Sequence, residues 1–438
     1  MPDQALLDDL LDWLRIPSIS TGGGDPADLE RAAAWAVERV RAAGGEADVV
    51  PTRGNPLAVG ELRAAADDAP TVLIYGHYDV QGVGDEAAWT TPPFAPDIRD
   101  GRIYARGAAD DKGNFLPLLH VACAMAKAGE LPVHVRVLVE GEEEAGSVGV
   151  TDWVRADERR ADAAIVFDSG VVDEQTPAIT VGLRGVVMLN VEARCSRRDL
   201  HSGIYGGSVL NAIHVLHGVL GAVLPGPDGR LRDELRAGIA PASDAERASW
   251  ARLPSGDDVL SAVGAAPVHP GAGAEYYERN GADASLDVNA IGAGAPRTVV
   301  PSVARATLSM RLAPGQDPAH ARGALTELLQ GATPAGAEVI VTGEHDATPA
   351  LFPPEDPAIA LAAEAIERAT GAAPAFVRSG GSIPVVAELA ARGMPVVVSG
   401  FATEDDAFHA PNESYRLKGL EDGTAAAREL YLALAGLR

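Results

Sequence analysis

The sequence predicts an α/β protein with a mainly parallel sheet, into which a smaller α+β domain is inserted. Short continuous apolar runs alternate with helical patterns, which is typical of strands that are buried on both faces. Between residues 184 and 345 the order changes to β-α-β-β-α-β. A chain of 438 residues is too long for one simple core. We therefore expect a discontinuous first domain of residues 1–183 and 346–438, and an inserted domain of residues 184–345.

The first domain is predicted from two kinds of apolar spacing. Apolar residues at helical intervals predict helices, and uninterrupted apolar runs predict strands. The expected helices are residues 3–15, 28–43 and 115–128. The expected strands are residues 71–76, 133–139, 163–167 and 395–400.

The inserted domain has a different texture, with strands in a ferredoxin-like order. Its expected strands are residues 185–193, 286–291, 304–312 and 338–341, and its helices are 208–223 and 317–329. Residues 225–283 are rich in proline, glycine and charge, and we expect mixed helix and loop there.

Composition excludes several classes of function. A formal net charge of −26 argues against nucleic acid and anionic membranes as partners. No apolar run is long enough to span a bilayer, and the acidic, amphipathic N-terminus does not resemble a signal peptide. We therefore expect a cytoplasmic protein. Two cysteines, Cys123 and Cys195, cannot form a disulfide framework.

Five candidate metal ligands follow predicted strands or stand at the start of a helix. They are His77, Asp110, Glu144, Asp168 and His409. Taken singly, each has an ordinary explanation, such as a helix cap, a solvated acidic turn or a loop histidine. Proteins with parallel sheets bind small molecules and ions beyond the carboxyl ends of the strands, however. These side chains are therefore expected to share one site.

Together these residues form a mixed nitrogen and oxygen set that suits two divalent ions. With Asp110 as the bridge, one ion would take His77 and Asp168, and the other Glu144 and His409. Asp79 can accept the second ring N–H of His77 and so fix its tautomer.

One neighbouring acid is left without a ligand role. Glu143, beside a predicted ligand, is placed to deprotonate a water held by the metal ions.

Six ordered motifs then carry a family resemblance. They are residues 76–80, 107–113, 140–147, 199–203, 379–384 and 409–413. On these motifs the chain resembles the di-zinc peptidases that include cytosolic non-specific dipeptidase, carnosinase, acetylornithine deacetylase and succinyl-diaminopimelate desuccinylase. The dipeptidase branch is the most similar.

The resemblance implies a zinc-exopeptidase-like catalytic domain with two bound metal ions. Zn²⁺ is implied first, and Mn²⁺ or Co²⁺ are alternatives. It also implies a cis peptide between Asp110 and Asp111, an orienting role for Asp79 and an acid/base role for Glu143. The inserted domain is implied to be a lid through which a homodimer forms. From it, His201 would reach the partner's active site and steady the oxyanion of the tetrahedral intermediate.

Substrate contacts are also implied by the resemblance. Arg311 matches the family's anchor for the substrate carboxylate, for which a bidentate guanidinium is suited, although a structural salt bridge is an alternative. The other matching pocket residues are Thr298, His345, Gly381 and Ser382.

Two residues separate the possible activities. Asp168 matches family members that cleave peptides with a free amino end, whereas deacylases and carboxypeptidases tend to have Glu there. Ser379 stands where the similar dipeptidases carry Glu, which favours N-acyl or N-carbamoyl amino acids as substrates.

We expect a hydrolase of dipeptides or short peptides, with an N-acyl- or N-carbamoyl-amino-acid amidohydrolase as the alternative. A catalytically silent, metal-stabilised binding protein is a remote alternative, because Glu143 and all five ligands are present. Phosphoester hydrolysis at the two-metal site is less favoured, because the motifs match enzymes that act on amides.

Overall fold

The computed structural model describes residues 2–381 and 383–437, and the chain divides into two compact units. Unit 1 comprises Met1–Val181, Phe352–Val377 and Pro384–Arg438. Unit 2 comprises Gly182–Leu351 and Arg378–Ile383. The Arg378–Ile383 segment therefore belongs to the inserted unit, whereas we expected it in the first domain.

The larger sheet is mixed, and its central strands pair in parallel. Its order is β1-β2-β6-β3-β7-β17-β8-β15, with β16 paired to β8. The strands are β1 (Glu46–Val50), β2 (Leu57–Leu62), β3 (Thr71–His77), β6 (His134–Glu140), β7 (Ala163–Phe167), β8 (Ala178–Leu183), β15 (Ala350–Leu351), β16 (Ala375–Ser379) and β17 (Val396–Ser399). Strands β6, β3, β7 and β17 pair in parallel and are almost wholly buried, which explains their continuous apolar runs.

Helices cover this sheet in unit 1. They are α1 (Gln4–Leu14), α2 (Pro26–Ala42), α3 (Lys112–Ala128), α4 (Val148–Ala156), α10 (Pro357–Thr370), α11 (Pro384–Ala391) and α12 (Leu417–Leu434). Helices α2, α3, α10 and α11 contact the strands, and α12 packs on α3 and α10. The carboxylates of Asp3, Asp25 and Asp356 accept backbone N–H groups at three helix starts. A small separate sheet has the order β18-β5-β4, formed by β4 (Asp97–Arg99), β5 (Arg102–Tyr104) and β18 (Ser414–Arg416).

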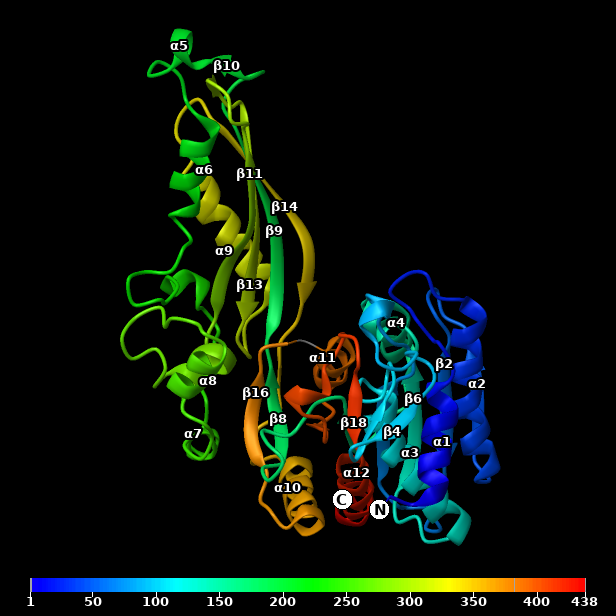
Figure 1. Ribbon diagram of the computed structural model, residues 1–438. Coiled ribbons are helices and arrows are strands. Elements are labelled where there is room, and N and C mark those ends of the chain that lie inside the picture. Colours follow the sequence, from blue (N-terminus) through cyan, green and yellow to red (C-terminus); the bar gives the residue numbers. More distant parts are fainter. Residues whose placement is uncertain (1, 382, 438) are drawn as a thin grey trace. The chain divides into compact units, whose positions relative to one another are not determined.

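Unit 2 has the expected ferredoxin-like sheet, in the order β11-β13-β9-β14. Its strands are β9 (Gly185–Arg194), β11 (Ser285–Ala293), β13 (Val303–Leu312) and β14 (Glu338–Ala347), and all neighbours are antiparallel. Helices α6 (Ala212–Leu220) and α9 (Pro318–Gly331) lie along one face (Figure 1). Alternate side chains of the strands and the helices' apolar stripes form one buried core.

Two further parts of unit 2 extend from this sheet. At one end, β10 (Leu200–His201) pairs with β12 (Val299–Val300), and α5 (Ser202–Tyr205) follows β10. The 225–283 excursion contains α7 (Asp244–Trp250) and α8 (Gly256–Ala262) among loops, so the expected mixture of helix and loop is confirmed.

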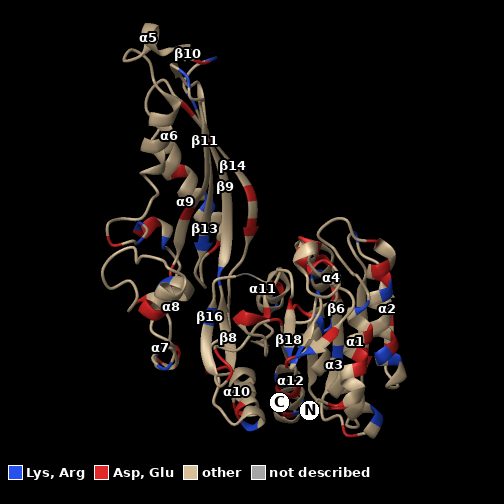
Figure 2. Cartoon of the chain, in the orientation of Figure 1, with Lys and Arg blue, Asp and Glu red and all other residues tan. Residues whose placement is uncertain are grey.

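Acidic residues are spread over both units (Figure 2). The net charge of −26 is thus not confined to one tail or one helix. Among the described residues, none of the helices combines the length and the apolar character needed to cross a membrane.

Candidate metal centre and active site

The carboxylate of Asp110 lies between two histidines in unit 1. Its Oδ1 is 3.0 Å from Nε2 of His77, and its Oδ2 is 3.0 Å from Nε2 of His409. A carboxylate that presents one oxygen to each of two ligand groups has the arrangement needed to bridge two metal ions. The Asp110–Asp111 peptide bond is cis, so this expectation is confirmed.

The structure brings all five candidate ligands together. One group is His77, Asp110 and Asp168, the other is Asp110, Glu144 and His409, and within each group the ligand atoms lie within 4.8 Å of one another. Nε2 of His409 is 3.2 Å from Oε2 of Glu144. Nε2 of His77 is 3.9 Å from Oδ1 of Asp168.

The parallel strands explain why residues so far apart in sequence meet. His77 is the last residue of β3, Asp168 follows β7, and Glu144 lies in the short 3₁₀ turn after β6. The carboxyl ends of β3, β6 and β7 share one edge of the sheet because the three strands are parallel. His409, on the loop after β17, has a φ of 58°.

The charges of the site fit bound cations. Four carboxylates, those of Asp110, Glu143, Glu144 and Asp168, surround the two histidines. Among the described residues, no lysine or arginine pairs with any of the four. Partly buried acids without a basic partner are unfavourable unless a cation accompanies them. Two imidazoles with carboxylates form a donor set that suits Zn²⁺, Mn²⁺ or Co²⁺.

Burial and neighbouring charges shift the titration of these groups. Burial and the charges of Asp110 and Glu144 raise the pKa of Glu143 to about 7. Hydrogen bonds with Asp110 and Glu144 raise the pKa of His409 to about 10. Burial opposes protonation of His77, but its hydrogen bonds with Asp110 and Asp79 still raise its pKa. In the absence of metal ions, hydrogen bonding with the neighbouring carboxylates therefore favours the protonated form of both imidazoles.

Asp79 fixes both the histidine and the turn that carries the acids. Nδ1 of His77 lies 3.0 Å from the Asp79 carbonyl oxygen and 3.4 Å from its carboxylate. The same carboxylate accepts the backbone N–H groups of Glu143 and Glu144, each at 3.2 Å, and the hydroxyl of Ser20 at 2.5 Å. Asp79 thus joins the end of β3 to the turn after β6.

Glu413 organises the loop that carries Asp110, a role that we did not predict from the sequence. Its buried carboxylate accepts the N–H groups of Gly107, Ala109 and Asp110 at 2.9, 2.9 and 3.1 Å. It also pairs with the buried guanidinium of Arg106 at 2.7 Å. The sequence signal was present, since Glu413 ends the motif that begins at His409, but it did not indicate which backbone groups the acid would hold.

Unit 2 carries the remaining candidates, and two of them, His201 and Arg311, lie at opposite ends of its sheet. His201 pairs with Val299 in the β10–β12 ladder, and the carbonyl of Thr298 accepts the backbone N–H of Ser202 at 3.0 Å, so His201 and Thr298 lie together. Arg311 lies near the far end of β13, where it pairs with Val186 of β9.

Two further candidates in unit 2 are described and one is not. His345 is exposed at a bulge of β14, paired with Met188 of β9. Gly381 donates its backbone N–H to Oγ of Ser379 at 3.1 Å. Ser382 lies outside the described residues.

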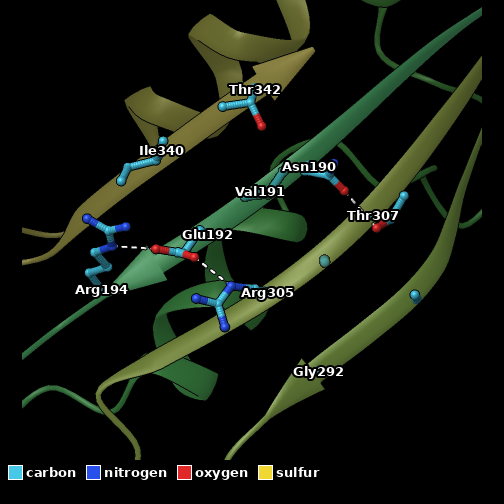
Figure 3. Close-up of a pocket in the computed structure, with 11 residues that line it drawn as sticks. Asn190, Val191, Glu192, Arg194, Gly292, Arg305, Thr307, Ile340 and Thr342 are labelled. Carbon is cyan, nitrogen blue, oxygen red and sulfur yellow. Dashed lines mark hydrogen bonds and ion pairs between the residues drawn. The ribbon is translucent and has the colours of Figure 1, made fainter. Parts of the chain in front are cut away.

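A pocket of about 450 Å³ on the sheet of unit 2 is a different feature (Figure 3). Its polar side chains largely satisfy one another: Glu192 pairs with Arg194 and Arg305, and the hydroxyl of Thr307 donates to Asn190. None of the candidate site residues is among those that line it. It therefore does not compete with the cluster around Asp110 as an active site.

Comparison with known families decides the kind of protein that carries this cluster. A profile of peptidase family M20/M25/M40 matches residues 73–433. The chain belongs to this family. The resemblance expected from the six motifs is thus confirmed, and the protein is an enzyme of a peptidase family.

Dipeptidases are among the M20 relatives. The Cys-Gly metallodipeptidase dug1 of Schizosaccharomyces pombe is 28% identical over 374 residues, 81% of this chain and 77% of that protein. The Beta-Ala-His dipeptidase of Rattus norvegicus is 30% identical over 241 residues, 52% of this chain and 49% of that protein.

A solved structure of an M20 enzyme has the same fold as this chain. The M20 metallo-carboxypeptidase Sso-CP2 of Sulfolobus solfataricus has a TM-score of 0.84 and 26% identity, over 98% of this chain and 99% of that one.

Proposed function

We propose that this M20 enzyme is a two-metal dipeptidase. The observation that carries the proposal is the Asp110 carboxylate, which lies 3.0 Å from His77 and from His409 and so joins two ligand groups. The dipeptidase names of the S. pombe and rat relatives support dipeptides as the substrates. At position 168 the family resemblance links Asp to enzymes that cleave peptides with a free amino end, and Glu to deacylases and carboxypeptidases. Asp168 therefore favours peptides with a free amino end.

The metal ions would be held by the two groups that share Asp110. His77 and Asp168 complete one group, and Glu144 and His409 complete the other. Zn²⁺ is the ion that we propose, with Mn²⁺ or Co²⁺ as alternatives. When bound, the two ions would acidify a water molecule and polarise the scissile carbonyl.

Glu143 would be the general base. Its backbone N–H is held by Asp79, and its pKa is raised to about 7, so it can both accept and return a proton near neutral pH. It would take the proton of the attacking water and then pass it to the leaving amine.

A second candidate function rests on Ser379. Its hydroxyl oxygen accepts the backbone N–H of Gly381 at 3.1 Å. The family resemblance implies an acid at this position in dipeptidases. A serine cannot form an ion pair with a free substrate amine. This favours hydrolysis of N-acyl or N-carbamoyl amino acids on the same fold.

A panel of substrates tests the proposal. Free dipeptides, their N-acetylated forms, N-carbamoyl amino acids and longer peptides would be incubated with protein supplied with Zn²⁺ or Mn²⁺. Cleavage of the free dipeptides in preference to all others would support the dipeptidase. Preference for blocked amino acids would support the second candidate, and preference for longer peptides would assign a carboxypeptidase-like activity.

Location in the cytoplasm stays an expectation. We also propose a homodimer in which His201 of each chain steadies the oxyanion in the active site of the partner. Residues from Val303 to Arg311 of β13 span roughly 26 Å at ~3.3 Å per residue. His201 is near the Val303 end, so one copy of unit 2 does not bring His201 to Arg311. The exposed side chain of Ile204, beside His201, suits coverage by a second copy.

Replacing His201 with alanine is expected to lower kcat by about 10²-fold or more, as for other oxyanion stabilisers, without loss of metal. Mixed dimers of His201→Ala and Glu143→Gln chains should regain activity, because one of their two sites has both residues intact. Activity would be measured on purified heterodimers that carry two different affinity tags. Heterodimers as inactive as either parent would contradict the cross-subunit role.

A further inference from the structure

Arg184, between β8 and β9, is a buried arginine without an acidic partner. Its exposed fraction is 8%. Its Nη1 donates to Oγ of Ser285 at 3.2 Å, and its Nε has no hydrogen-bond partner among the described residues. Other buried arginines are paired with carboxylates: Arg106 with Glu413, Arg136 with Asp157 and Arg416 with Glu174. Arg184 is therefore a desolvated cation whose counter-charge is missing from the described chain.

A second guanidinium lies beside it. Arg311 of β13 is the register partner of both Ser285 of β11 and Val186 of β9. Because side chains alternate along a strand, Arg184 projects on the same side as Val186, Arg311 and Ser285. Burial first, and then the charge of Arg311, lower the pKa of Arg184 to about 10. Two cations and a hydroxyl thus face one another.

The nearby acids do not supply the negative charge that Arg184 lacks. Asp283 is already bound by the guanidinium groups of Arg230 and Arg236. Asp287 is exposed, and its carboxylate acts on Arg184 only through its charge, with no ion pair between them. Among the described residues, Arg311 forms no ion pair or side-chain hydrogen bond either. The missing partner is an anion that is not part of the described chain.

The glycine-rich segment after β16 lies against the same guanidinium. The backbone N–H of Arg184 donates to the carbonyl of Ser379 at 3.1 Å. A Cβ placed on Gly380 would lie 3.2 Å from Nη2 of Arg184, so a side chain there would press on the guanidinium. Arg184 is thereby linked to Gly381, which we expect in the substrate pocket.

We propose that Arg184, together with Arg311 and Ser285, binds the free C-terminal carboxylate of the substrate. The inference rests on the proposed function for the identity of the substrate, and it adds a residue to the single anchor expected from the sequence. A carboxylate is planar, accepts parallel hydrogen bonds from a guanidinium and supplies the missing negative charge. The class of substrate is therefore a peptide or acyl amino acid that ends in a free carboxylate, and C-terminal amides should be poorer substrates because they cannot supply the negative charge.

The turnover test compares alanylalanine with its C-terminal amide. Arg184→Gln is expected to lower kcat/KM for the acid by about 10- to 100-fold, the effect of losing one or two charge-assisted hydrogen bonds. The amide should change much less, so selectivity for the acid collapses. Arg184→Lys keeps the charge and should recover part of the loss. Arg305→Gln, at the other end of β13, is the matched control and should keep full selectivity. Equal losses for acid and amide would overturn the proposal in favour of a structural role.

A binding test separates this inference from the proposed function. Calorimetry would measure N-acetylalanine and N-acetylalaninamide on the metal-loaded wild type, Arg184→Gln and Arg184→Lys proteins. The carboxylate site is supported if the wild type binds N-acetylalanine more tightly than N-acetylalaninamide and Arg184→Gln loses this difference. This holds even if no peptide is hydrolysed and the dipeptidase proposal fails. Equal binding of the acid to all three proteins would overturn the site. Should Arg184→Gln fail to fold, acid-specific weakening in Arg184→Lys decides the question in the same way.

Discussion

Replacing Glu143 with glutamine is expected to lower kcat by about 10²- to 10⁴-fold, the range of a lost general base. The amide keeps the size of the side chain but cannot accept the proton of the attacking water. Glu143 is outside both ligand groups, so the metal content should stay that of the wild type. Turnover of a dipeptide and metal analysis of the same protein sample check both statements.

The matched control for this change is Glu86→Gln, which removes the same charge from an exposed residue of unit 1. It should retain wild-type turnover. If Glu143→Gln keeps kcat within about threefold of the control, the base is another group or the water loses its proton to solvent. A protein that binds its metal ions fully but hydrolyses nothing in the whole substrate panel would instead fit the silent binding protein.

Replacing Glu413 with alanine is expected to destabilise unit 1 by about 3–5 kcal/mol, because the buried Arg106 loses its only carboxylate partner among the described residues. Three backbone N–H groups, from Gly107, Ala109 and Asp110, lose their acceptor at the same time. The loop that presents Asp110 is then no longer fixed, so metal affinity should fall as well. Urea unfolding of the metal-free protein, followed by tryptophan fluorescence, measures the first effect.

An ion pair that is open to solvent on its basic side provides the control for Glu413. The side chains of Arg155 and Glu388 are 61% and 17% exposed, and Glu388→Ala should cost about 1 kcal/mol. Glu413→Gln keeps the size of the side chain and should fall between the two. A Glu413→Ala protein that unfolds at the urea concentration of the control and binds metal as tightly as the wild type would contradict the positioning role.

The parts of the fold that the sequence predicted best are the buried parallel strands. β3, β6, β7 and β17 are covered on both faces, so their apolar runs are continuous and their ends are marked by polar residues. The ligands at those ends could therefore be assigned to one edge of a sheet from the amino-acid pattern alone. The antiparallel strands β1 and β2 were not predicted: β1 is an edge strand with exposed positions, and β2, between β1 and β6, is a short run interrupted by Gly60 and Glu61.

The supporting residues were harder to predict because they act through tertiary contacts. Glu413 holds backbone groups about three hundred positions earlier in the chain, and no local pattern encodes that approach. Arg184 looks like an ordinary arginine at the start of a strand until its burial and its missing partner are visible. The Arg378–Ile383 segment joins unit 2 through contacts such as the ion pair of Arg378 with Glu246, which lies in the excursion.

The central claim is that two metal ions share Asp110 and make the site active. Its most direct test is a titration of metal-free protein with Zn²⁺, in which calorimetric heat and hydrolysis of a dipeptide are followed together. The raised pKa of His77 and the pKa of about 10 for His409 mean that protons compete with metal ions for both rings, and burial raises the pKa of the ligand Asp168 as well. Binding should therefore release protons and should weaken as the pH is lowered.

We predict two ions per chain, proton release that is visible as a dependence of the heat on the buffer, and hydrolysis that reaches its maximum at the second equivalent. In Asp110→Ala both ligand groups lose their shared member, so two-ion binding and hydrolysis should disappear together. Saturation at a single ion with full activity, or a dipeptidase activity that the metal-free protein retains, would contradict the account.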